Sequence, residues 1–247
     1  MELVPPPKSG RRFAREVVAG LADATASRRV RLDAIARWLQ DVAYADIAAA
    51  GLATHGAWIV RRARLCVDSF PRFGDPVLLR TFCSGAGRAA AECRTSVSGG
   101  DAAVEAVATW IHVDGRRLRP LRLGREFDAV YGESAGDRGA DFRLRHRDPP
   151  PDAPAAWPWR FRAADVDVAG HVNNAAYWAA VEERFAPDGE PASVDLEIEY
   201  REPAQPGEAQ IVCAGSMMWL CGRGRSVHAS IAGLPHATGA EAPLPGL

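Results

Sequence analysis

An internal duplication restricts the fold of this 247-residue chain more than any other feature of its sequence. Residues 64–82 have the pattern of a strand, a turn that contains Pro and Gly, and a second strand, and residues 197–213 repeat it. Gly74 in the first turn aligns with Gly207 in the second, 133 residues later. The chain is therefore expected to contain two copies of one antiparallel unit.

The two copies also agree upstream of these strands, where each has one helical segment. Apolar side chains in residues 30–47 recur close to the helical period, and Gly51 follows as a C-terminal stop. Residues 173–183 predict a shorter helix in the second copy, and Asn173 is suited to cap its N-terminus. Three further strands are expected at 89–97, 103–113 and 226–231.

These elements indicate an α+β fold in which each unit runs from strand to helix to antiparallel meander. A single helix between strands buries its apolar face most easily if the sheet curls around it. We expect an N-terminal unit at 10–125, a Pro-rich connector at 126–156, a C-terminal unit at 157–233 and a mobile tail at 234–247. The prolines near the end of the connector stiffen it and exclude helix there.

The composition excludes several classes of protein. Hydrophobic residues make up 47% and charged residues 25% of the chain, which is typical of a globular domain. No apolar run approaches the ~18–20 residues of a membrane-spanning helix, and the N-terminus lacks a signal-peptide pattern, so we expect a cytoplasmic location and no membrane span. The five cysteines form no Cys-x-x-Cys pair, and no phosphate loop or metal-ligand set is visible. We therefore expect no disulfide framework, no metal and no cofactor.

Positive charge is distributed unevenly, although the net charge is only −1. Lys8 is the only lysine, and the arginines form two clusters: Arg116, Arg117, Arg119, Arg122 and Arg125, then Arg143, Arg145 and Arg147. The clusters are either a solvated surface or a docking patch for an acidic carrier or a phosphate. The slightly acidic balance and the lack of a nucleic-acid motif argue against nucleic acid as a partner.

Residues 165–174 read Asp-Val-Asp-Val-Ala-Gly-His-Val-Asn-Asn and stand where the second helix is predicted to begin. This segment resembles the Asp-x-Asp-x-Asn-x-His-Val-Asn-Asn segment of the plant and bacterial acyl-acyl carrier protein thioesterases. Residues 58–64, 70–75 and 199–201 also resemble that family. The resemblance implies a tandem hot-dog fold, with each sheet wrapped around a central helix. It also implies hydrolysis of a fatty acyl thioester, in fatty acid biosynthesis.

The residues themselves support the same chemistry. Thioester hydrolysis needs an activated water and a site for the developing oxyanion, and a helix N-terminus offers unpaired N–H groups. Asp167 is suited to act as a general base, and His171 to polarise the water or hold the carbonyl. Asn173 is either a reactive group or a helix cap. As structural alternatives, Asp167 is a turn residue and His171 a buried histidine that satisfies backbone groups.

Further candidates concern the substrate pocket. Asn174, Tyr177, Trp178 and Trp38 are candidates for its wall. Tyr177 and Trp178 are equally well suited to the core, and Asn174 to local hydrogen bonds. Leu39, beside Trp38, is on the same helix of the first unit.

The segment and the late strand depart from the family pattern at three positions. Ala169 replaces the Asn that the family has two residues before His. Pro203 stands where the family has a catalytic Glu, unless a one-residue slip lets Glu202 serve. Ala204 replaces a family cysteine, which argues against a nucleophilic cysteine. The remaining catalytic set is Asp167, His171, Asn173 and Glu202, by general-base activation of water.

Several functions remain open at this point. Acyl carrier protein is the first candidate for the carrier of the acyl group, and acyl-CoA at the same site is an alternative. The losses at 169 and 203 keep open a non-catalytic acyl-binding protein. A dehydratase fits less well, because the first unit has no His-Val-Asn-Asn and should be catalytically empty. Two units in one chain supply the pairing that single hot-dog proteins reach by dimerising, so the protein is a monomer or a homodimer.

Overall fold

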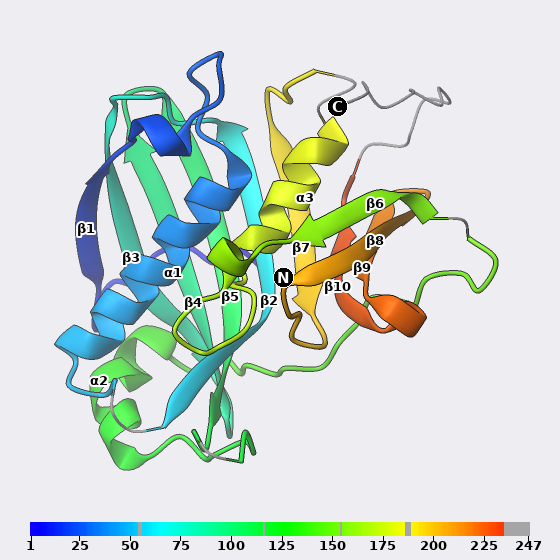
Figure 1. The fold of residues 1–247 in the computed structure, drawn as a ribbon. Helices are drawn as coiled ribbons and strands as arrows, with labels where there is room; N and C mark the ends of the chain where they lie inside the picture. The colour runs from blue at the N-terminus through cyan, green and yellow to red at the C-terminus, as the bar shows by residue number, and fades with distance from the viewer. Residues whose placement is uncertain (54–55, 116, 154, 186–188, 235–247) are drawn as a thin grey trace.

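The computed structural model describes residues 1–53, 56–115, 117–153, 155–185 and 189–234. Within these residues, the strands form one antiparallel sheet in the order β1-β3-β4-β5-β2-β7-β10-β9-β8-β6 (Figure 1). The strands of the first half are β1 (Phe13–Val18), β2 (Ala57–Ser69), β3 (Pro76–Ala86), β4 (Ala90–Gly99) and β5 (Ala102–Val113). Those of the second half are β6 (Ala155–Phe161), β7 (Val194–Tyr200), β8 (Gly207–Ala214), β9 (Met217–Cys221) and β10 (Val227–Ala232).

The two halves have equivalent strand orders when each is followed from its own edge of the sheet to the centre. From one edge it runs β1-β3-β4-β5-β2, and from the other it runs β6-β8-β9-β10-β7. The halves meet where β2 pairs with β7 in antiparallel register, with Leu65 opposite Leu196. This arrangement confirms the predicted duplication and the predicted tandem hot-dog fold.

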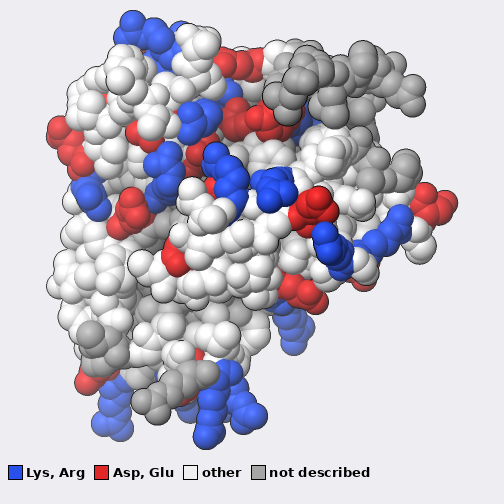
Figure 2. All heavy atoms as spheres, in the orientation of Figure 1, with Lys and Arg blue, Asp and Glu red and all other residues white. Residues whose placement is uncertain are grey.

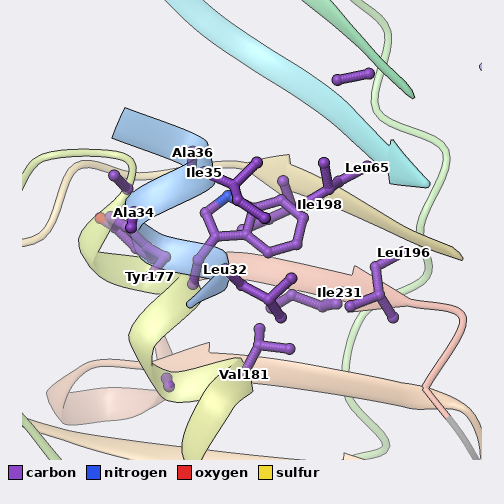
Figure 3. Packing of buried hydrophobic residues seen from close by; sticks show 14 of the residues in the cluster. Leu32, Ala34, Ile35, Ala36, Leu65, Tyr177, Val181, Leu196, Ile198 and Ile231 are labelled. Carbon is purple, nitrogen blue, oxygen red and sulfur yellow. The ribbon is translucent and has the colours of Figure 1, made fainter. Parts of the chain in front are cut away.

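Two helices lie side by side on one face of the sheet, α1 (Leu32–Ala49) from the first half and α3 (Ala176–Phe185) from the second (Figure 1). Figure 3 shows Ile35 of α1 and Val181 of α3 pointing toward the same strands, where Ile198 and Ile231 lie. All four side chains are fully buried. The two halves therefore share one hydrophobic core.

Most of the predicted elements are present within a few residues of their expected bounds. Helix α1 ends at Ala49, and Gly51 follows with φ +75°, a left-handed conformation that Gly adopts without steric cost. Two elements were not predicted: β9, and helix α2 (Arg125–Ala135), which lies in the expected connector. Helix α2 packs Phe127 and Tyr131 against a small second core.

The expected mobile tail begins with an ordered residue. Leu234 is buried, and its N–H donates to the carbonyl of Ser216 at 3.2 Å. The rest of the tail, residues 235–247, lies outside the described residues. None of the described helices is long and apolar enough to cross a membrane.

A buried charge cluster covers the outer face of the β2–β7 junction. The guanidinium of Arg62, 2% exposed, lies 2.6 Å from Glu197 and 3.4 Å from Glu199. Glu199 is fully buried and also accepts the backbone N–H groups of Arg145 (2.7 Å) and His146 (2.9 Å). The connector is therefore fastened across the junction by a carboxylate of β7.

The substitution Glu199→Ala is expected to destabilise the protein by about 3–5 kcal/mol, because it leaves Arg62 less compensated and two backbone N–H groups unpaired. Urea unfolding of the variant and the wild type measures this difference. The control is Glu208→Ala, which breaks an exposed pair with Arg223 (3.2 Å) and should change stability by less than about 0.5 kcal/mol. Equal losses for the two variants would show that the junction does not depend on Glu199.

Candidate active site

The segment 165–174 forms a compact turn between β6 and α3. It starts with the short 3₁₀ turn η2 (Ala163–Asp165), where Asp165 accepts the N–H of Arg162 at 2.7 Å. The N–H of Asp167 donates to the carbonyl of His171 at 3.1 Å, and Gly170 between them has φ +80°, which permits the tight reversal. Asp165 is thus a turn residue, and the turn brings Asp167, His171 and Asn173 to the start of α3.

Hydrogen bonds hold the carboxylate of Asp167 in place. Its Oδ1 accepts the backbone N–H of Ala169 at 2.8 Å, and its Oδ2 accepts the side-chain Nδ2–H of Asn173 at 2.9 Å. The Oδ1 of Asn173 in turn accepts the N–H of Ala175 at 2.8 Å and the Nε2–H of Gln40 at 2.9 Å. Two donors on one side of the amide fix its orientation, so its NH₂ faces the carboxylate. Asn173 is therefore both a cap for the helix start and a support for Asp167.

The other predicted residues of this segment take different places. His171 is half-buried, and its ring forms no hydrogen bond with a described residue. The carbonyl of Asn174 accepts the hydroxyl of Tyr200 at 3.1 Å, and that hydroxyl accepts the indole N–H of Trp178 at 3.0 Å. These two bonds tie the start of α3 to β7.

Tyr177 belongs to the core. It is 2% exposed, and its hydroxyl accepts the N–H of Ala204 at 3.1 Å. Burial raises the pKa of Tyr177 to about 12, so the phenol stays neutral at ordinary pH. The backbone of Ala204 also accepts the N–H of Val172 at 3.0 Å, which fixes the turn against the loop after β7.

Glu202 is not joined to this network. It is exposed on the loop after β7, and its carboxylate forms no hydrogen bond or ion pair with a described residue. Pro203, at the position of the family Glu, is exposed as well. The structure thus links Asp167 and Asn173 directly, places His171 in the same turn, and leaves Glu202 apart.

An apolar slot begins at the start of α3 and runs beneath α1. It is narrow, with a cavity volume of about 40 Å³. Its lining residues include Asn174 and Trp178 of the second half, with Leu39, Gln40 and Ala43 of α1. The remaining wall comes from neighbouring strands: Tyr200 of β7, Val60 and Ala63 of β2, Ala106, Ala108 and Trp110 of β5, and Cys93 and Thr95 of β4.

Because β7, β2, β5 and β4 are consecutive in the sheet, the slot crosses three strand spacings, roughly 14 Å. Trp38 was a candidate for the wall of the substrate pocket, and that role stays a prediction. It is 6% exposed in the core and not part of the slot wall, whereas the adjacent Leu39 is. One residue along a helix turns the side chain by roughly 100°.

The first half contains the same turn 142 residues earlier. Asp23 accepts the N–H of Gly20 at 2.9 Å, as Asp165 accepts that of Arg162. Arg28 has φ +71° where Gly170 has +80°, and Ala24 bridges Val30 as Val166 bridges Val172. In this frame Thr25 corresponds to Asp167, Arg29 to His171, and Gln40 to Glu182.

An ion pair fills the place that corresponds to the candidate site. The guanidinium of Arg29 binds both carboxylate oxygens of Glu182 in α3, at 3.2 and 2.6 Å, and lies 4.5 Å from the ring centre of Phe70. Arg29 is only 5% exposed. The same Glu182 accepts the N–H of Leu32 at 2.6 Å, which caps α1. One turn thus presents a carboxylate and a histidine, and the other is closed by a salt bridge.

One group of metal-type ligands exists among the described residues, His146 with Glu197 and Glu199. It lies at the β2–β7 junction, outside the slot. Glu197 already binds Arg62 at 2.6 Å and the N-terminal amine of Met1 at 2.9 Å. Burial lowers the pKa of His146. The guanidinium of Arg62 also lies 3.4 Å from Glu199, so both carboxylates of this group are ion-paired within the protein.

The fold and the site together define a tandem hot-dog protein with one open turn and an apolar slot. The chain matches the acyl-ACP thioesterase N-terminal domain over residues 10–131 and the acyl-ACP thioesterase C-terminal domain over residues 150–228. It belongs to the acyl-ACP thioesterase family and is a thioester hydrolase.

Individual proteins resemble the chain in sequence or in fold. An uncharacterized protein of Mycobacterium tuberculosis, Rv2001, is 28% identical over 211 residues, which is 84% of each chain. An acyl-ACP thioesterase from Bacteroides thetaiotaomicron has a similar fold, with a TM-score of 0.74 and 14% identity over 89% of this chain and 96% of that one. The 12:0-ACP thioesterase from Umbellularia californica has a TM-score of 0.71 and 19% identity over 92% and 97%.

Filling the slot should shorten the acyl group that the enzyme accepts. Ala108→Phe adds a ring to the middle of the slot wall and is expected to lower kcat/KM for long acyl thioesters at least about tenfold relative to short ones, because longer chains no longer fit. Hydrolysis of a series of acyl thioesters measures the shift. The control is Ala103→Phe, an exposed position on the same strand. An unchanged chain-length profile for Ala108→Phe would contradict this use of the slot.

Proposed function

We propose that the protein hydrolyses fatty acyl thioesters carried by acyl carrier protein and releases free fatty acid. The acyl chain occupies the slot beneath α1, and the thioester lies at the start of α3. The observation that carries this proposal is the continuity of the slot with the Asp167 network, through Asn174 and Gln40. A chain bound along the slot would end beside a fixed carboxylate.

In this mechanism Asp167 is the general base. Each of its carboxylate oxygens accepts one hydrogen bond, so lone pairs remain for a water molecule. The water transfers a proton to Asp167 as its oxygen attacks the thioester carbonyl. The helix start and His171 stabilise the oxyanion of the tetrahedral intermediate. When the intermediate collapses, the C–S bond breaks and the proton passes to the thiolate, which leaves as the carrier thiol.

The choice of carrier protein over coenzyme A is supported by the surface charge. Figure 2 shows basic side chains at the lower end of the molecule, where Figure 1 places the segment between β5 and α2. Arg117, Arg119, Arg122 and Arg125 are exposed there and form no ion pair with a described carboxylate. In the second cluster, Arg145 pairs with Asp141 at 3.2 Å. An acidic carrier would meet uncompensated positive charge at the first cluster.

Asp167→Asn should lower kcat for acyl-thioester hydrolysis about 10²–10⁴-fold, because the amide cannot accept the proton of the attacking water. Thermal unfolding checks that the variant still folds, because the new NH₂ group replaces one of the two oxygens that accept hydrogen bonds from Ala169 and Asn173 in the wild type. The control, Glu202→Gln, should keep wild-type kcat, because that carboxylate is not part of the network. Full activity in Asp167→Asn would exclude this residue as the base.

The carrier is tested by comparing one acyl group on acyl carrier protein and on coenzyme A. The triple change Arg117→Glu, Arg119→Glu and Arg122→Glu should raise KM for the carrier-linked substrate by about tenfold or more and leave acyl-CoA hydrolysis nearly unchanged. Arg143→Glu with Arg147→Glu is the matched control from the second cluster. A wild-type preference for acyl-CoA, with no effect of the triple change on carrier-linked turnover, would favour the coenzyme A alternative.

A further inference from the structure

We propose that Gln40 of helix α1 is a positioning residue for the hydrolysis proposed above: it holds Asn173 in the one orientation that supports Asp167. This inference rests on the proposed function, in which Asp167 is the base. It adds a residue from the N-terminal unit to a site whose other members lie in the C-terminal unit.

The argument starts from the polarity of a side-chain amide. Asn173 supports an ionised Asp167 only if its NH₂ faces the carboxylate, because the flipped amide would place oxygen against oxygen. The Nε2–H of Gln40 donates to Oδ1 of Asn173 at 2.9 Å, on the side away from Asp167. A flip would therefore break the bond to Gln40 and also repel Asp167. Gln40 thus affects the carboxylate of Asp167 indirectly, through the side-chain amide of Asn173.

The first half of the chain supplies an internal comparison. Glu182 of α3 corresponds to Gln40 of α1, and each reaches the turn at the start of the other helix. Glu182 is an acceptor, and it faces the guanidinium of Arg29 and the N–H of Leu32. Gln40 faces the carbonyl oxygen of an amide, which requires a donor. In each copy, the side chain at this helix position is therefore complementary to the facing turn: Glu182 accepts hydrogen bonds from donors, and Gln40 donates one to an acceptor.

The setting of Gln40 makes a catalytic effect separable from a structural one. It is half-buried at the slot wall and not part of the hydrophobic core. The other charged or titratable side chains of the facing turn are His171 and Asp165, and Asp165 is paired with Arg162 at 2.7 Å. A change at position 40 substitutes none of these side chains, so a fall in kcat with unchanged KM reports on the Asn173–Asp167 contact.

The experiment uses the full-length enzyme with Gln40→Leu and Gln40→Glu, and with Gln210→Glu at an exposed position of β8 as the control. Gln40→Leu removes the donor, and kcat is expected to fall about tenfold, the effect of one lost hydrogen bond. Gln40→Glu places an acceptor against Oδ1 of Asn173. The repulsion weakens the hold on the amide, and kcat is expected to fall at least as far as in Gln40→Leu while KM stays within about twofold of the wild type, because Gln40 acts on the support of Asp167 and not on substrate binding.

A double-mutant cycle separates positioning from damage to the fold. If Gln40 acts through Asp167, then adding Gln40→Leu to Asp167→Asn should cost less than about twofold in residual kcat, because the base is already absent. A full tenfold loss in that background, or a rise in KM with unchanged kcat in Gln40→Glu, would overturn the proposal. If Gln40→Leu fails to fold, Gln40→Asn, which shortens the donor by one methylene, replaces it in the cycle.

The outcomes also distinguish this proposal from the proposed function. If the wild type hydrolyses no acyl thioester, or if Asp167→Asn keeps full activity, the proposed function or its base is wrong whatever happens at position 40. If Asp167→Asn loses activity while both Gln40 variants behave like Gln210→Glu, the proposed function stands and only the role of Gln40 is wrong.

Discussion

The pairing of β2 with β7 is the interaction on which the rest of the structure depends. Each hot-dog sheet alone would expose an edge strand with unpaired N–H and C=O groups. Joining the two edges removes that exposure and continues one sheet through both halves. It also places α1 and α3 side by side on the inner face, where they share a core. The contacts from each helix to the turn of the other exist only because of this junction.

The two copies have the same backbone conformation at the turn before the helix but differ in the side chains that occupy it. Both turns use an Asp at the same place, a residue with positive φ at the same place, and the same bridge between their arms. One turn is then filled by Arg29 and Glu182, and the other presents Asp167 and His171. Helix α1 has 18 residues and covers the slot. Helix α3 has 10 residues and follows the turn that contains Asp167. In the proposed function, substrate binding and chemistry are in this way divided between the copies.

The sequence predicted the elements whose patterns are local. Helix α1 and most of the meander strands follow from periodicity and from Pro and Gly in the turns. Helix α2 was missed because it is short and polar on average, and its apolar residues pack on a separate small core. Strand β9 was missed because four of its five residues are buried, so polar and apolar positions do not alternate. Within the site, the turn residues could be found from the segment, but Gln40 could not, since its contact spans 133 residues.

Two of the departures from the family pattern, at residues 169 and 203, have different consequences for Asp167. The loss of the side-chain amide at residue 169 leaves the backbone N–H of Ala169, and that N–H donates to the carboxylate whatever the side chain is. Pro203 removes a carboxylate from the family position, and Glu202 does not replace it at the network. Among the described residues, Asp167 therefore has no second carboxylate in its hydrogen-bonded network, and each of its oxygens accepts one hydrogen bond. In the proposed function, a single carboxylate held by an amide and a backbone N–H acts as the general base, and its position depends on the orientation of that amide.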